Sequence, residues 1–312
     1  PLHLSGFHAL PDVPLIFFIL IFLLFLKHYL ENDSMRIAMA LGVIAAGILN
    51  SKYHGILVLM PVLFAAPAIA KRRSFWLAVF LCTLLMLPHL MWQINHDFAS
   101  LQFHLNERSW WHEPYRFIST LKYIGMQPII IGPIMGFLMF FALIKRQITN
   151  QYDRILIAQI IVIYLFFLTI TFNGGPVHRH WTIPALPAIL ILSIQFFDQH
   201  QKQYQNLLRY VGLASLLIFI PARAALFYDF LPEAIPHDKN HGWKIWAEEI
   251  EAQAGEKPIV FLSSFQDASR FDFYSNTQAI SLSNIYDRRS QYDLWNFNKG
   301  FFGHDVIILS RD

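Results

Sequence analysis

Two charged side chains stand out because they lie at the edges of long apolar runs. Asp12 follows Pro11 at the start of the first run, and Lys52 lies in the polar string NSKYHG between two others. A charge beside hydrocarbon is costly unless it is paired or solvated. The dipole of a helix N-terminus alone would favour the aspartate, and a lysine can extend its ammonium to the membrane interface. A lysine at a helix break, beside Tyr53 and His54, also suits a point-charge contact with a phosphate.

The polar loop from Asn95 to Phe117 holds further candidate groups. His104 and Arg108 are four residues apart, so a helical turn would place an imidazole and a guanidinium on one face, with Glu107 beside them. The tryptophans of this loop equally fit an aromatic belt at the membrane surface. In the later string HRHW, His180 can bind a metal or exchange protons, or it can simply cap a span. The spacing of these residues is not specific for a metal, so a divalent ion is neither required nor excluded.

Composition points to a membrane protein. Hydrophobic residues make up 55% of the 312 residues and charged residues only 14%, with a mean hydropathy of +0.40. A soluble chain of this length would have more apolar surface than one core can bury. The net charge of +3 is small and dispersed, which argues against a nucleic-acid partner. The single cysteine, Cys82, excludes an intrachain disulfide. The chain begins at Pro1, and we expect it to be a fragment whose natural start is missing.

Apolar runs predict roughly eight membrane helices, since about 20 residues are needed to cross the hydrocarbon layer. The runs are Val13 to Leu30, Met35 to Leu49, Ile56 to Ala70, Phe75 to Ile94, Ile118 to Ile144, Ile155 to Phe172, Trp181 to Phe197 and Leu207 to Phe227. Alternating spans bring the four connections that carry the clustered basic residues to one side. The positive-inside rule makes that side cytoplasmic. The loop from Asn95 to Phe117, the loop that contains HRHW and everything after Phe227 are then expected on the outer side.

The tail has a different pattern. Asn240 to Ala254 predicts an amphipathic helix, and Pro258 to Leu262 and Asp305 to Leu309 predict short buried strands, with a helix from Gln266 to Tyr274. We therefore expect an α-helical multi-pass membrane domain over residues 1–227. A small extracytoplasmic α/β domain, cut short at its end, is expected over residues 228–312.

Four strings occur in order along the chain: ALPDVPLIFFILIFLLFL, GILNSKYHGILVL, LPHLMWQINHDFASLQFHLNER and HRHWTIPALPAILIL. Together they resemble the GT-C integral-membrane glycosyltransferases of the dolichyl-phosphate-mannose protein mannosyltransferase and aminoarabinose transferase type. The resemblance implies a GT-C helical bundle in a bacterial inner or plasma membrane. It also implies an enzyme that moves a sugar from a polyprenyl-phosphate carrier to a protein, lipid or glycan acceptor on the outer face.

The resemblance also implies roles for single residues. Asp12 matches the acidic residue of the outer cavity, and Lys52 matches the lysine that contacts the donor phosphate. His104 and Arg108 match groups near the phosphate or a metal, and His180 matches the entry to a later span. The catalytic aspartate of the family is expected upstream of this chain.

Two other functions use similar features. A transporter or flippase of envelope lipids or glycans also uses intramembrane charges and broken helices, and a membrane-embedded glycan polymerase is a third candidate. The folded tail and the absence of a visible inverted repeat in the sequence favour the transferase. The sequence names neither the sugar, nor the acceptor, nor the oligomeric state.

Overall fold

The structure is a computed structural model that describes residues 10–102, 115–172, 177–225, 227–228, 241–262, 264–282, 290–295, 303 and 305–310. Contacts divide the chain into two units, residues 1–218 and residues 219–312. The sequence analysis placed the domain boundary after residue 227, where the composition becomes polar. The contacts place it within the last turns of the helix α11 (Gln201–Ala224).

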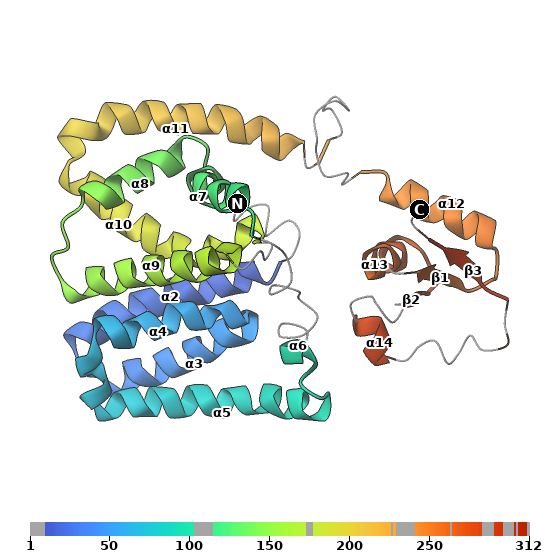
Figure 1. Ribbon diagram of the computed structural model, residues 1–312, viewed down its shortest axis with the longest axis horizontal. Coiled ribbons are helices and arrows are strands. Elements are labelled where there is room, and N and C mark those ends of the chain that lie inside the picture. Colours follow the sequence, from blue (N-terminus) through green and yellow to red (C-terminus); the bar gives the residue numbers. More distant parts are fainter. Residues whose placement is uncertain are drawn as a thin grey trace. The chain divides into compact units, whose positions relative to one another are not determined.

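The first unit is a bundle of apolar helices, and Figure 1 shows most of them running alongside one another. Its α-helices are α2 (Asp12–Glu31), α3 (Met35–Ser51), α4 (Ile56–Ala65), α5 (Arg73–Asn95), α6 (Ala99–Gln102), α7 (Phe117–Ile131), α8 (Met135–Lys145), α9 (Gln151–Phe172), α10 (Leu186–Gln199) and α11. Within the described residues, short 3₁₀ helices join them: η1 (Tyr53–Gly55), η2 (Pro67–Lys71) and η4 (Arg179–Ala185). Leu23, Phe167 and Ile189 are fully buried where α2, α9 and α10 meet. The bundle is that of a multi-pass helical membrane protein.

The sequence analysis expected about eight spans. Within the described residues, five helices are long and apolar enough to cross a membrane, and a sixth span results if α7 and α8 are one bent pair. The continuous span expected from Ile118 to Ile144 is bent by 103° between these two helices. A Cβ at Gly136 would lie 1.8 Å from the carbonyl oxygen of Pro128, so only glycine permits this close approach. The α3 helix and the Tyr53–Ala65 segment form apolar helices that are shorter than the other spans.

The connections that carry clustered basic residues lie at one end of the bundle. Figure 1 shows the α2–α3, α4–α5, α8–α9 and α10–α11 connections at the left, as the alternation of spans predicted. We call this the basic end. Arg72 joins two of these connections, because its guanidinium donates to the carbonyl oxygens of Tyr29 and Leu30 at the end of α2. The opposite end, which we call the Asp12 end, contains the start of α2 and the break after α3.

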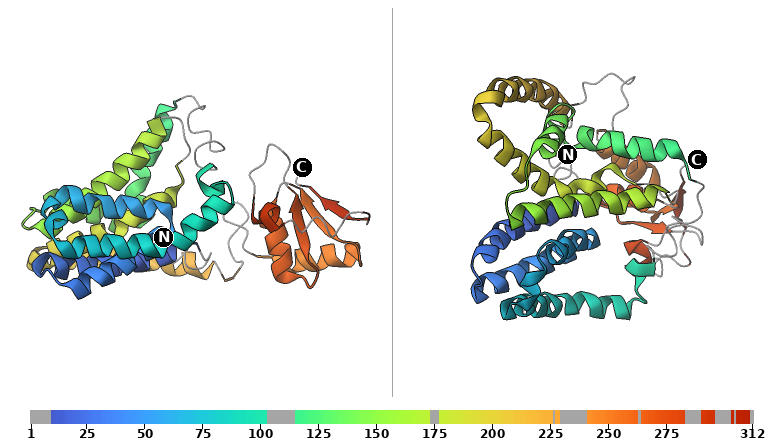
Figure 2. Two further views of the ribbon diagram at one scale, coloured as in Figure 1. Left: turned by 90° about the horizontal axis from the view of Figure 1, so that it is seen from below. Right: turned by 60° about the vertical axis from the view of Figure 1, so that its left-hand side comes forward.

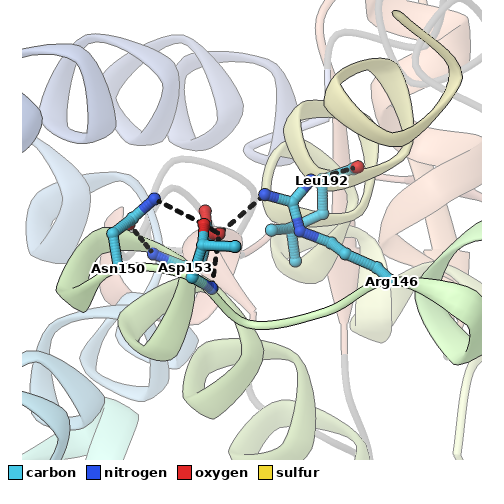
Figure 3. A network of polar contacts seen from close by, with 5 residues as sticks. Arg146, Asn150, Asp153 and Leu192 are labelled. Atoms are coloured by element: carbon cyan, nitrogen blue, oxygen red, sulfur yellow. Dashed lines mark hydrogen bonds and ion pairs between the residues drawn. The ribbon is translucent and has the colours of Figure 1, made fainter. Parts of the chain in front are cut away.

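A buried ion pair fixes the α8–α9 connection at the basic end (Figure 3). Arg146 donates to Asp153 Oδ2 at 2.7 Å and to the carbonyl oxygen of Leu192 on α10 at 2.8 Å. The Asp153 side chain has no exposed surface, and that of Arg146 is 5% exposed. Asn150 caps α9 by accepting from the Asp153 backbone N–H at 2.9 Å. This pair therefore holds α8, α9 and α10 together.

The second unit contains a three-stranded parallel sheet with strand order β2-β1-β3. Its elements are α12 (Trp243–Ala254), β1 (Ile259–Leu262), α13 (Phe265–Tyr274), β2 (Ala279–Leu282), α14 (Gln291–Trp295) and β3 (Ile307–Leu309). Apolar side chains of α12 and α13 pack with Ile259 and Phe261 on one face of the sheet (Figure 2). Both strands and both helices predicted for the tail are confirmed. The sequence analysis missed β2, because a polar serine interrupts its residues, AISL, whereas β1 and β3 lie in continuous apolar runs.

One carboxylate joins three elements of this unit. Asp272 on α13 accepts from the Ala279 backbone N–H at 2.6 Å and from the Tyr292 hydroxyl at 2.8 Å. Burial, together with the neighbouring Asp272, raises the pKa of Tyr292 to about 12. The phenol therefore stays protonated and remains a donor over the physiological pH range.

We predict that removing one partner of the Arg146–Asp153 pair lowers the free energy of unfolding more than removing both partners does. Asp153→Leu should lower the free energy of unfolding by about 3–5 kcal/mol, because it leaves a buried unpaired guanidinium. Arg146→Met combined with Asp153→Leu should cost less than Asp153→Leu alone. Chemical denaturation in mixed micelles measures both. Arg154→Met, which changes an exposed neighbour, is the control, and a double variant less stable than the single one would contradict the prediction.

Candidate functional site

The site is built around an ion pair between the start of α2 and the helix break that follows α3. Lys52 Nζ lies 2.9 Å from Asp12 Oδ1 and 3.2 Å from Oδ2. The Asp12 side chain is 1% exposed and that of Lys52 is 20% exposed. Asp12 is also the first residue of α2, where the helix dipole favours a negative charge. The carboxylate is thus stabilised inside the protein, while part of the Lys52 side chain remains accessible.

The chain breaks its helix at Lys52 for local reasons. Asn50 and Ser51 donate back to the carbonyl oxygens of Ala46 and Gly47, at 2.9 and 2.7 Å, a pattern that competes with continued helix. Lys52 itself is extended, with φ −165° and ψ 135°. A Cβ at Gly55 would lie 2.3 Å from Ile48 Cγ2, so the tight turn of η1 against the end of α3 requires glycine.

Histidines and aromatic rings from two other elements approach this break. His54 packs against Phe167 of α9 and Trp181 of η4, with ring centroids 5.2 and 5.7 Å apart. His178 packs on Trp181 at 4.9 Å. His180 is close enough to Asp12 and Lys52 to interact electrostatically with both charges. Segments that are far apart in the sequence therefore converge at the Asp12 end.

A polar network holds η4 against the bundle. Thr182 donates to Gln127 Oε1 on α7 at 2.8 Å, and Gln127 donates to the carbonyl oxygen of Tyr123 at 2.9 Å. Tyr123 in turn donates to the carbonyl oxygen of Tyr164 on α9 at 2.9 Å. The orientation of the histidine-bearing turn therefore depends on α7 and α9.

Tyr53 belongs to a second cluster next to the ion pair. Its hydroxyl oxygen lies 2.7 Å from His89 Nε2 and accepts from Gln93 Nε2 at 2.6 Å. His89 and Gln93 are on α5, and Gln93 is 6% exposed. The sequence analysis did not single out either residue. The signal that could have found them is a His and a Gln four residues apart, on one face of an otherwise apolar span.

The structure brings together some of the predicted site residues and leaves others undescribed. Asp12, Lys52, Tyr53, His54 and His180 lie at the Asp12 end. His104, Glu107 and Arg108 lie outside the described residues. Within the described part of the chain, no group of three or more His, Cys, Asp or Glu side chains could hold a metal ion.

Comparisons with known proteins agree with this architecture. Residues 4–92, which include Asp12, Lys52 and Tyr53, match the family described as dolichyl-phosphate-mannose-protein mannosyltransferase. The chain is also 25% identical over 224 residues to the lipid A galacturonosyltransferase RgtD of Rhizobium johnstonii. The chain is similar to GT-C membrane glycosyltransferases. The alignment with RgtD covers 69% of this chain and 46% of the relative, so the chain spans about half the length of that protein. No solved structure matches the chain.

The segment that matches the family overlaps the candidate site. The matched segment contains both members of the ion pair and the helix break that presents Lys52. The alternative interpretations of Asp12 as a simple helix-starting residue and of Lys52 as a snorkelling lysine do not describe the geometry fully. The two side chains bind each other rather than extending separately to the interface.

We expect Asp12→Asn to lower the free energy of unfolding by about 1–3 kcal/mol, because a charge-assisted hydrogen bond to Lys52 is lost. Chemical denaturation in mixed micelles measures this change in the free energy of unfolding. Asp97→Asn, a change at an exposed carboxylate, serves as the matched control. Equal stability of the two variants would show that the ion pair contributes nothing.

Proposed function

We propose that the protein is a membrane glycosyltransferase that moves a sugar from a polyprenyl-phosphate donor to an acceptor hydroxyl. The observation that carries this proposal is Lys52, a partly exposed side chain whose ammonium is held by a buried carboxylate at a break in an apolar helix. An anionic group on a membrane lipid can reach such a cation without leaving the bilayer interface. Histidines and aromatic rings from η1 and η4 surround the same position.

The proposed reaction exchanges one bond for another at the anomeric carbon of the sugar. The bond between this carbon and the donor phosphate oxygen breaks, and its electron pair leaves with the polyprenyl phosphate. The acceptor oxygen bonds to the same carbon, and the acceptor proton passes to a general base. Negative charge grows on the phosphate during this step, so a positioned cation stabilises the transition state. An ammonium has three N–H donors, so Lys52 can bind a phosphate oxygen while remaining bound to Asp12.

Asp12 is proposed to position Lys52 rather than to act as the general base. Both of its carboxylate oxygens lie within 3.2 Å of Lys52 Nζ, and the side chain is 1% exposed. A base has to approach the acceptor hydroxyl to within about 2.6–3.2 Å, which this pairing opposes. Another carboxylate must therefore accept the proton. Arg108 and His104 are proposed, from the family resemblance, to join Lys52 at the phosphate.

The name of the relative suggests the first substrates to assay. RgtD is named as a galacturonosyltransferase that acts on lipid A. We propose a polyprenyl-phosphate-linked galacturonic acid as the first donor probe and lipid A as the first acceptor probe. Both are membrane lipids, which suits a site at the end of a membrane bundle.

The Asp12 end is proposed to face the outer side of the membrane. Basic residues gather in the connections at the opposite end, and such connections are retained in the cytoplasm. The α11 helix begins at the basic end, so one crossing by this helix would deliver the tail to the outer side as well.

A transporter or flippase remains the second candidate, and the sharp bend supports it. The 103° break between α7 and α8 and the interrupted helix at Lys52 are features that transporters also use at substrate sites. The two functions differ in whether the bond between sugar and phosphate is cleaved.

We predict covalent transfer that depends on Lys52. In proteoliposomes supplied with labelled galacturonosyl donor and lipid A, Lys52→Ala should lower kcat/KM about 10- to 150-fold, because one charge-assisted phosphate contact contributes about 1.5–3 kcal/mol. Flux of labelled sugar across the vesicle membrane is followed in parallel. Lys71→Ala, at an exposed lysine of the basic end, should leave transfer unchanged. Sugar that crosses the bilayer with its phosphate bond intact would sink the transferase assignment.

Cysteine labelling tests the orientation. In a Cys82→Ala background, Asp97→Cys at the Asp12 end and Glu256→Cys in the tail should react with an impermeant maleimide in intact cells. Gln147→Cys at the basic end should react only after permeabilisation. All three positions are exposed, so accessibility within the protein does not limit the reaction. The reverse pattern would place the site in the cytoplasm.

A further inference from the structure

Tyr53, the residue that follows Lys52, is held by two side chains of α5. Gln93 Nε2 donates to the Tyr53 hydroxyl at 2.6 Å, and the same hydroxyl lies 2.7 Å from His89 Nε2. The Tyr53 and His89 rings are 5.6 Å apart. His89 and Gln93 are one helical turn apart on α5, so they present both groups on one face. The hydroxyl thus has two partners on a single rigid helix.

The Tyr53 hydroxyl links the two side chains. It accepts a hydrogen bond from the Gln93 amide, and it can donate its own hydrogen to His89 Nε2 when that histidine is protonated on Nδ1. Such an arrangement fixes the phenol position more firmly than a single bond does, since both the donor and the acceptor capacity of the hydroxyl are used. Gln93 is buried, so water competes little for its amide.

A second anchor lies at the next residue. His54 packs against Phe167 of α9 and Trp181 of η4, whereas Tyr53 is bound to α5. Lys52 precedes both residues, with its backbone extended and its carbonyl oxygen accepting from Gly55 N–H at 2.9 Å. A lysine side chain has considerable rotamer entropy. Fixing the two residues that follow Lys52 restrains its backbone and reduces the number of positions that its ammonium can sample.

We propose that Tyr53, His89 and Gln93 are positioning residues that hold Lys52 in place for the donor phosphate. This inference rests on the proposed function, because it takes Lys52 as the phosphate contact. The ligand is a lipid phosphate. Tyr53, His89 and Gln93, which we call the triad, affect the binding of this phosphate by positioning Lys52 and do not contact the phosphate themselves.

The competing explanation is that the triad only packs α3 against α5. The two explanations can be separated, because α3 and α5 also contact each other elsewhere. Gly42 packs directly against the Ala78 backbone, and Asn50 Nδ2 lies 3.1 Å from Met86 Sδ. Neither contact involves the Tyr53 hydroxyl. Tyr53→Phe should therefore leave the helix pair assembled.

The test measures binding of undecaprenyl phosphate to the protein in nanodiscs, with undecaprenol as the phosphate-free control. Tyr53→Phe and His89→Ala should each raise the Kd for undecaprenyl phosphate about 3- to 10-fold, within the range found for coupled neighbouring residues. His89→Gln, which keeps an acceptor for the hydroxyl, should stay within about twofold of the unmodified protein by the same measure. Tyr210→Phe and His28→Ala, at exposed positions of α11 and α2, are the matched controls.

The deciding comparison repeats Tyr53→Phe in a Lys52→Ala background. If Tyr53 acts through Lys52, it should have no further effect there. An equal loss in both backgrounds would overturn the inference, and so would an unchanged Kd for Tyr53→Phe alone while Lys52→Ala weakens binding. An unchanged Kd for Lys52→Ala itself would instead remove the phosphate role of Lys52 and the proposed function with it.

Discussion

A polar group inside a lipid bilayer has no water to bind, and this constraint organises the bundle. The Gln159 amide donates to the Val58 carbonyl oxygen at 2.8 Å, and the Tyr152 hydroxyl donates to the Leu23 carbonyl oxygen at 3.1 Å. Both bonds join helices that are distant in the sequence. Apolar contacts alone do not distinguish protein from lipid, so polar contacts of this kind specify which helices meet. At the Asp12 end, the Asp12–Lys52 pair is a polar contact of this kind in which both partners are charged.

The same constraint explains why a site can be held at a helix break. A break frees backbone groups, and these remain stable in a membrane only where other parts of the protein cover them. Around Lys52 this cover comes from α2, α5, α9 and η4. The interrupted segment is therefore rigid rather than loose, because each of its three residues after Ser51 has a side-chain contact with a different helix.

Hydropathy and turn residues predicted most of the helices, and the order of the four strings predicted the resemblance to GT-C proteins. The basic residues also placed four connections together correctly. The bend after α7 was missed, because it depends on the fit of Gly136 against Pro128 in three dimensions. The contact between Asp12 and Lys52 was missed for a similar reason. Both residues were identified, but no local pattern shows that side chains so far apart in the chain bind each other.

The distance in sequence between Asp12 and Lys52 has a consequence for how the protein is made. The two residues are separated by 40 positions, so the ribosome delivers α2 to the insertion machinery well before the lysine emerges. Lys52 can reach Asp12 only after α3 has crossed the membrane and the chain has returned to the side of Asp12. The ion pair therefore belongs to the assembled pair of helices, and a substitution at Lys52 would affect how α2 and α3 come together during biogenesis.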